Sequence, residues 1–172
     1  FSVDVGDLFY SVPHEELFVA VRESIEENGV VGFQNACGVG LDGFMELLKV
    51  YLQSTFILFE GGYYVQKAGI CIGSCVAPVL CDIFLAKFDR NVQNGLEGKQ
   101  VCKVVRYVDD YLVLWQRSEN LLTCQVVESV LKVFHDNSSG LKFSHELPDG
   151  QFLQFLDLRL QFTGNHVCWS YH

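Results

Sequence analysis

Two adjacent aspartates between two apolar runs constrain the fold of this chain more than any other feature. Asp109 and Asp110 are preceded by VVRYV and followed by YLVLW. β-branched and aromatic runs of this length favour strands, and Asp is a favoured turn residue. The pattern predicts a β-hairpin over residues 101–115, with both carboxylates near its turn.

The remaining predicted elements mix strands and helices without a strict alternation. This order favours an α+β fold, with an antiparallel sheet and helices packed on one of its faces. The other predicted strands are residues 1–5, a hairpin over 56–66 around Gly61-Gly62, and residues 141–147, 151–162 and 167–171. Four helices are predicted. The first runs from Pro13 to Glu27 with the proline as an early residue, and the second covers residues 42–53 with Asp42 as N-cap. The third is a buried helix over 77–92 that is apolar nearly all round, and the fourth covers 118–136 with Ser118 as N-cap.

Composition excludes several classes of protein. A chain of 172 residues that is 49% hydrophobic can bury a core and is not a disordered acidic tail. Its 12 Lys and Arg against 21 Asp and Glu give a net charge of −9, which argues against a free-standing module that grips nucleic acid or an anionic membrane by charge. No apolar run reaches the ~20 residues of a membrane span, so no membrane partner is expected.

The cysteines point to a reducing compartment. The chain has 7 cysteines, an odd number, and no CxxC pair. We therefore expect reduced thiols, which are buried in the case of Cys71 and Cys75. Reduced thiols indicate an intracellular protein, located in the nucleus or the cytoplasm.

A third carboxylate, Asp4, lies in an apolar run at the start of the chain, FSVDV. Carboxylates among apolar residues repel one another and are costly unless a cation compensates them, and a divalent metal with hard oxygen ligands is the natural one. A solvated hairpin tip with acids as turn residues explains Asp109 and Asp110 equally well. The metal-site interpretation requires the first strand to pair beside the hairpin in one sheet.

Four motifs in order resemble those of reverse transcriptases. DVGDLFYSVP at 4–13 resembles motif A, QKAGICIGS at 66–74 followed by Ala77-Pro78 resembles motif B, and YVDD at 107–110 resembles motif C. LKFSHE at 141–146 and FLD at 155–157 resemble the motif D and E region. The IGS form of motif B and the later strings are most similar to Penelope-like retroelements. The resemblance implies a polymerase palm as the fold and RNA-directed DNA polymerase as the activity.

The resemblance also implies a metal site. Asp4 and Asp109 would be the main ligands of two Mg²⁺ ions, with Asp110 as the auxiliary ligand and the Val5 carbonyl in the shell; Mn²⁺ is the alternative ion. Two such cations suit nucleotidyl transfer to a primer 3′-hydroxyl.

Further residues are implied to contact the incoming nucleotide. Phe9, five residues after Asp4, falls where the family places a steric gate against ribonucleotides, although residue type alone favours an ordinary core Phe. Asp7 and Leu8 lie within motif A and would be neighbours of the triphosphate, Asp7 through its backbone N–H. Gly73 would let backbone approach the nucleotide, and Gln66 would contact template or primer or be a surface Gln.

Residues 1–172 are therefore interpreted as one reverse transcriptase domain, a palm core with motifs A to E, without the N-terminal part of the fingers and without the thumb. The implied partners are an RNA or DNA template with primer, dNTPs, and the missing fingers and thumb. Two alternatives are an inactive or domesticated reverse-transcriptase fragment that acts as a binding or structural module, and another palm-type enzyme such as a nucleotide cyclase, whose glycine-rich hairpin signature is absent.

Overall fold

The computed structural model describes residues 1–116, 122–164 and 166–171, which form two compact units. The first unit comprises residues 1–6, 92–137 and 142–172, and the second comprises residues 7–91 and 138–141. The boundary falls within helix α5 (Ala77–Leu96). Within the described part of the chain, no helix is both long and apolar enough to cross a bilayer.

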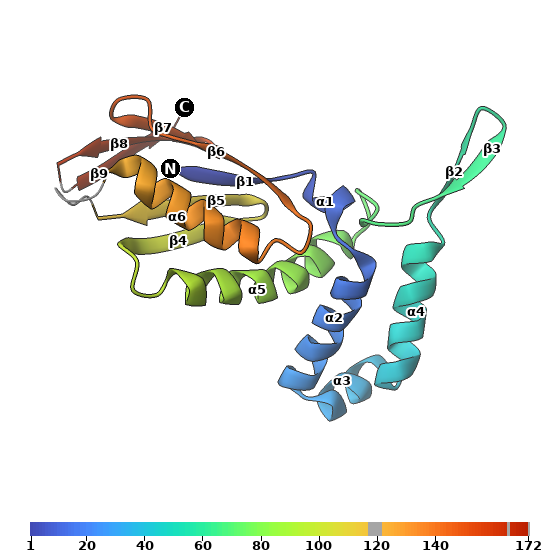
Figure 1. Ribbon diagram of the computed structural model, residues 1–172. Helices are drawn as coiled ribbons and strands as arrows, with labels where there is room; N and C mark the ends of the chain where they lie inside the picture. Colours follow the sequence, from blue (N-terminus) through green and yellow to red (C-terminus); the bar gives the residue numbers. More distant parts are fainter. Residues whose placement is uncertain (117–121, 165, 172) are drawn as a thin grey trace. The chain divides into compact units, whose positions relative to one another are not determined.

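The first unit is built on a four-stranded antiparallel sheet in the order β4-β5-β1-β6 (Figure 1). Its strands are β1 (Ser2–Gly6), β4 (Val101–Tyr107), β5 (Asp110–Trp115) and β6 (Lys142–Glu146). Side chains alternate between the two faces of a strand, and Val3, Val5, Tyr111 and Val113 are all buried. One face of the sheet is therefore apolar and is available for a helix to cover.

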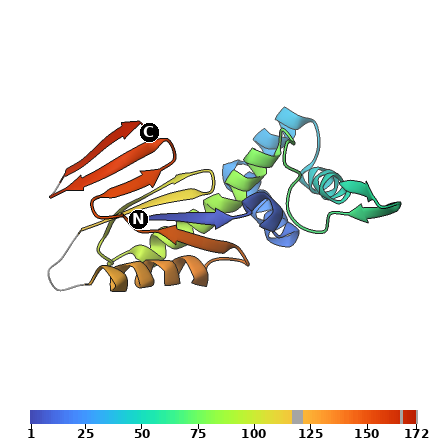
Figure 2. The same cartoon turned by 90° about the horizontal axis from the view of Figure 1, so that it is seen from above.

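Helix α6 (Thr123–Asp136) covers that apolar face, as Figure 2 shows. The Phe134 ring lies edge-on to Tyr111 of β5 at 5.2 Å and to Phe143 of β6 at 5.5 Å between centroids. Val133 of α6 also packs closely on Gly95, near the end of α5. Helices on one face of an antiparallel sheet are what the sequence predicts.

A second, three-stranded sheet completes the first unit. It consists of β7 (Phe152–Phe155), β8 (Leu158–Thr163) and β9 (His166–Tyr171), in that order. Its buried residues Leu153, Phe155 and Leu160 pack with Leu112 of β5. Leu112 lies between the buried Tyr111 and Val113, so this cluster adjoins the sheet face opposite α6.

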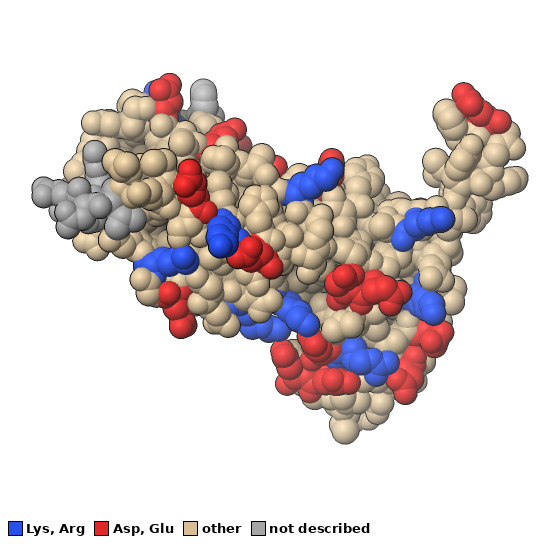
Figure 3. Space-filling model, in the orientation of Figure 1, with Lys and Arg blue, Asp and Glu red and all other residues tan. Residues whose placement is uncertain are grey.

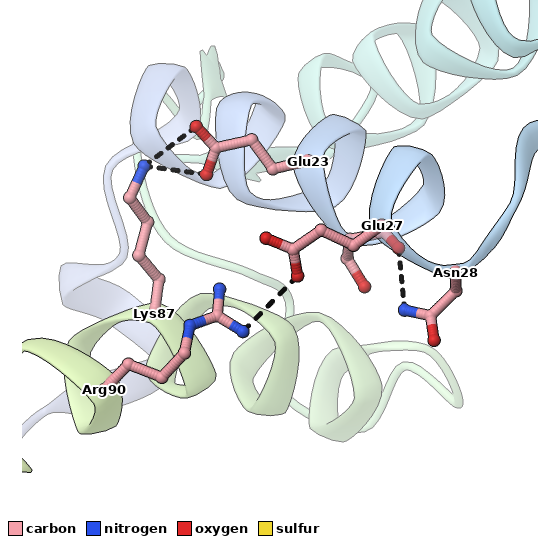
Figure 4. Close-up of polar contacts among 6 residues, drawn as sticks. Glu23, Glu27, Asn28, Lys87 and Arg90 are labelled. Carbon is pink, nitrogen blue, oxygen red and sulfur yellow. Dashed lines mark hydrogen bonds and ion pairs between the residues drawn. The ribbon is translucent and has the colours of Figure 1, made fainter.

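The second unit is mainly helical. It contains α1 (Leu8–Ser11), α2 (His14–Asn28), α3 (Val30–Cys37), α4 (Leu41–Gln53) and the α5 residues up to Asn91. Phe33 of α3 lies edge-on to Phe44 of α4 at 5.0 Å. Acidic side chains gather on the visible surface of α2 to α4, with few basic ones between them (Figure 3). Two ion pairs join α2 to α5, Glu23–Lys87 at 2.8 Å and Glu27–Arg90 at 3.4 Å (Figure 4).

The same unit carries the hairpin of β2 (Phe56–Phe59) and β3 (Gly62–Val65). This confirms the hairpin predicted around Gly61-Gly62. Its side chains are exposed on both faces, for example Phe56 at 64% and Tyr63 at 76%. Apolar and aromatic runs therefore define the strands here without indicating burial.

Several predicted boundaries and burials are wrong. Gly40, not Asp42, is the N-cap of α4, and Asp42 lies in the first turn, where it pairs with Arg22. Helix α6 begins at Thr123 with Leu122 as N-cap, and Ser118 lies outside the described residues. The single strand predicted over 151–162 is instead the β7–β8 hairpin, because Leu156 adopts a left-handed conformation (φ 53°) and reverses the chain.

Two further corrections concern burial. Helix α5 is one-sided, with buried residues such as Leu85 and Phe88 at helical spacing and Val79 exposed at 57%. All seven cysteines are free thiols, but Cys71 and Cys75 are exposed on a loop outside the helices and strands, so their predicted burial is wrong.

Candidate active site

The pairing of β1 with β5 places Asp4 directly opposite Asp110. This confirms the condition that the first strand lies beside the second hairpin. Because Val3, Val5 and Tyr111 point into the core beneath α6, alternation turns Asp4 and Asp110 to the other face of the sheet. Two carboxylates distant in the sequence therefore become neighbours on a sheet surface.

Asp109 lies in the turn that joins β4 to β5. Tyr107 pairs with Asp110, so Val108 and Asp109 form a two-residue turn. Val108 has a φ of 55°, an unusual conformation for a β-branched residue. The Val5 N–H donates to the Asp109 carbonyl at 3.1 Å, and Arg106 Nη1 donates to the Val108 carbonyl at 3.0 Å. The first bond holds the turn against β1, and the second is made within the hairpin.

The electrostatics of this face are those of crowded carboxylates. The pKa of Asp110 is raised above its ordinary value by burial and then by the negative charges of Asp109, Asp4 and Glu146. Ionised Asp110 is therefore destabilised by its surroundings, and a cation placed among these groups would relieve the repulsion.

Strand β6 contributes two polar residues to the same face that the sequence analysis did not identify. Ser144 pairs opposite Asp4, and its Oγ donates to Asp4 Oδ2 at 3.4 Å. Glu146 pairs opposite Ser2 and acts on Asp110 through its charge. In the sequence, the only sign that Ser144 and Glu146 share a face is their spacing of two residues along 142–146. That spacing becomes informative only when β6 is known to lie beside β1.

The donor chemistry of this site suits Mg²⁺, since the groups are hard carboxylate oxygens in a negative environment. Among the residues that the structure describes, however, no three His, Cys, Asp or Glu side chains are gathered into a metal-holding cluster. Strand pairing brings the backbones of Asp4, Asp109 and Asp110 together, but their carboxylates are not close enough to form such a cluster. The Val5 side chain is buried, which leaves only its backbone for a ligand role.

The other predicted site residues belong to the second unit. Asp7 is exposed and adopts a left-handed conformation (φ 53°) at the start of α1. Leu8 is 2% exposed, so only its backbone is available to a nucleotide, and Phe9 is partly buried. Gly73 is exposed with a φ of 90°, and Gln66 Nε2 donates to the Ala68 carbonyl at 2.9 Å.

Within that unit, the motif B segment contacts the motif A segment through Gly69 and Ile70. The Gly69 N–H donates to the Val12 carbonyl at 2.9 Å, and the Ile70 N–H donates to the Phe9 carbonyl at 2.6 Å. His14 Nε2 lies 2.7 Å from the Gly69 carbonyl. The five histidines form no ligand set in the sequence, so His14 would be expected to be a surface or structural residue.

The fold is that of a polymerase palm. The chain matches apo telomerase from Candida tropicalis, truncated from its C-terminal domain, with a TM-score of 0.68 and 14% identity over 98% of this chain and 35% of that one. It also matches Candida tropicalis telomerase in complex with the TWJ fragment of telomeric RNA, with a TM-score of 0.66 and 12% identity over 93% of this chain and 28% of that one. These likenesses establish the fold alone.

The family follows from the sequence. The family model described as reverse transcriptase (RNA-dependent DNA polymerase) matches residues 1–146, so the chain belongs to the reverse transcriptase family. It is 31% identical over 98 residues to the COX1/OXI3 intron 2 protein of Saccharomyces cerevisiae, covering 57% of this chain and 10% of that protein. It is 26% identical over 110 residues to the telomerase reverse transcriptase of Euplotes aediculatus, covering 60% and 10% respectively. The chain thus spans about a tenth of the length of these curated relatives.

Proposed function

We propose that this chain is the palm of an RNA-directed DNA polymerase of a Penelope-like retroelement, which transfers dNTPs to a primer 3′-hydroxyl. The observation that carries the proposal is the pairing of Asp4 opposite Asp110, with the Asp109 carbonyl bonded to the Val5 N–H. Family membership and a relative encoded by an intron support the polymerase and the retroelement setting. The Penelope-like assignment rests on the IGS form of motif B and the strings that follow it.

The carboxylates of the first unit form the proposed catalytic face. Asp4 and Asp109 are the principal ligands of two Mg²⁺ ions, with Asp110 as auxiliary ligand and the Val5 carbonyl completing the shell. When bound, the ions supply activation of the primer hydroxyl and stabilisation of the leaving pyrophosphate. The protein positions the carboxylates by strand pairing, and the Ser144 hydroxyl orients Asp4.

The second unit supplies the proposed nucleotide contacts. The Phe9 ring blocks the 2′-hydroxyl of a ribonucleotide, and the backbones of Asp7 and Leu8 face the triphosphate. Gly73, which has nothing within 4 Å of where a Cβ would lie, leaves room for the nucleotide, and Gln66 contacts template or primer. Fingers and thumb segments of the full-length protein are the proposed partners in holding the template–primer duplex.

The test is primer extension on poly(rA)/oligo(dT) with Mg²⁺ or Mn²⁺, using the longest natural polypeptide that contains residues 1–172. Asp4→Asn and Asp109→Asn should each abolish extension while leaving the circular dichroism spectrum unchanged. Asp149→Asn is the matched control, because it removes an exposed carboxylate of the same unit at a turn, and it should extend like wild type. Activity retained in Asp4→Asn or Asp109→Asn would refute the site, and a folded but inactive wild type would favour the inactive-fragment alternative.

A further inference from the structure

The turn that carries Phe9 is fixed by direct backbone contacts with the loop at Gly69-Ile70. The Ile70 N–H donates to the carbonyl of Phe9, which lies in helix α1, and the Gly69 N–H donates to the carbonyl of Val12, the C-cap of that helix. A Cβ on Gly69 would lie 2.6 Å from the Phe9 carbonyl oxygen and 2.7 Å from Tyr10 Cα. Only a residue without a side chain allows this approach.

His14, the first residue of α2, also contacts this loop at Gly69. Its Nε2 lies 2.7 Å from the Gly69 carbonyl oxygen, which can only accept, so Nε2 carries the hydrogen and donates. The His14 ring also packs against Phe18, one turn further along α2, at 6.2 Å between centroids. A ring set in a helix therefore anchors the backbone of a loop.

The loop is held by individual hydrogen bonds and not by regular secondary structure. Residues 66–76 form no helix or strand. Loss of the His14 donor would leave the partly buried Gly69 carbonyl without that bond and would free the peptide that joins Gly69 to Ile70. Because the Ile70 N–H holds the Phe9 carbonyl, a shift of this peptide moves the Phe9 turn.

We propose that His14 is a positioning residue for sugar selection, acting through Gly69 and Ile70 on the placement of Phe9. The inference rests on the proposed role of Phe9 as the steric gate. A gate selects by the position of its ring, and displacements near 1 Å are enough to change rates at an active site. His14 itself touches neither nucleotide nor metal in this scheme.

The experiment compares the efficiency (kcat/KM) of dNTP and rNTP incorporation by the full-length protein and its variants. His14→Phe keeps a ring against Phe18 but removes the donor, so the dNTP preference should fall about 3- to 10-fold, which corresponds to the ordinary worth of one hydrogen bond. His14→Gln places an amide N–H at a similar reach and should keep the preference within about twofold of wild type. His14→Asn has a donor but a shorter side chain and should behave like His14→Phe.

The Phe9→Ala variant distinguishes a failure of the His14 positioning role from a failure of the proposed Phe9 gate. If Phe9→Ala leaves the dNTP preference unchanged, the gate assignment itself is wrong. If Phe9→Ala lowers the preference while the folded His14→Phe and His14→Asn proteins keep it, the positioning role is overturned. Equal losses for both nucleotides in the His14 variants would indicate a purely structural contact and would also overturn it. The Asn variant decides the matter if the Phe variant does not fold.

Discussion

Replacing Gly69 by Ala should destabilise the second unit more than any other single-methyl addition in the same loop. Gly69 has a φ of 78°, and an added Cβ would meet backbone atoms of Phe9 and Tyr10 at 2.6–2.7 Å. Contacts that short do not relax by a rotamer change, because the atoms on the other side belong to the main chain. Either the loop or the Phe9 turn must move.

The magnitude follows from three contributions. The left-handed conformation costs an Ala about 1–2 kcal/mol, and the stiffer unfolded chain returns about 0.4–1 kcal/mol. Overpacking against backbone adds about 1–3 kcal/mol. The expected loss is therefore about 1–4.6 kcal/mol, with a midpoint of about 3 kcal/mol. Gly73 offers a matched control, since its φ is 90° but nothing lies within 4 Å of its Cβ position, so Gly73→Ala should cost only about 0–1.6 kcal/mol.

Urea unfolding followed by circular dichroism measures both variants, and hydrogen exchange locates the effect. The N–H groups of Gly69 and Ile70 donate to Val12 and Phe9, so they should exchange slowly in wild type and in Gly73→Ala but faster once residue 69 is Ala. Equal stability losses in the two variants would refute the close-contact argument and leave only backbone strain.

Two further predictions concern the first unit. Gly95→Ala should lower the unfolding free energy by about 1–2 kcal/mol despite the better helix propensity of Ala, because the added Cβ would lie 2.6 Å from Val133 Cγ1. A double-mutant cycle tests this: the Gly95→Ala/Val133→Ala variant should lose less stability than the sum of the two single losses. Asp110→Asn should raise the unfolding free energy at neutral pH, because the raised pKa of Asp110 means that its ionised form costs stability. The stability advantage of Asp110→Asn over wild type should shrink as the pH falls through the raised pKa toward the ordinary value of 3.8. Urea titrations of both proteins across this pH range measure the advantage, and a constant advantage would contradict the reasoning.

The sequence predicted the elements whose patterns are long and regular. The hairpin around Asp109-Asp110 and the helix after Pro13 were confirmed, since each combines a clear period with a turn or cap residue. Helix α3 was missed because Val30-Val31 and Gly32 are poor helix formers, and it has no buried residue to mark a face. Its ring contact between Phe33 and Phe44 is tertiary and leaves no local signal.

The candidate site was predictable only as separate pieces. The motifs singled out Asp4, Asp109 and Asp110, but the pairing of β1 between β5 and β6 is a long-range choice among strands with similar patterns. Ser144 and Glu146 gain their place on the carboxylate face entirely from that choice. His14 is the same kind of case, since its partner is a backbone carbonyl 55 residues away.

The net charge of −9 is not explained by the proposed catalytic carboxylates. The second unit holds eleven acidic side chains against five basic ones, so it contributes most of the excess. Three of those five bases, Arg22, Lys87 and Arg90, are already paired with carboxylates of the same unit. Such pairs stabilise little at a surface, but they occupy the cations that a phosphate backbone would otherwise meet. We therefore expect the proposed polymerase to hold template and primer through basic side chains outside this unit.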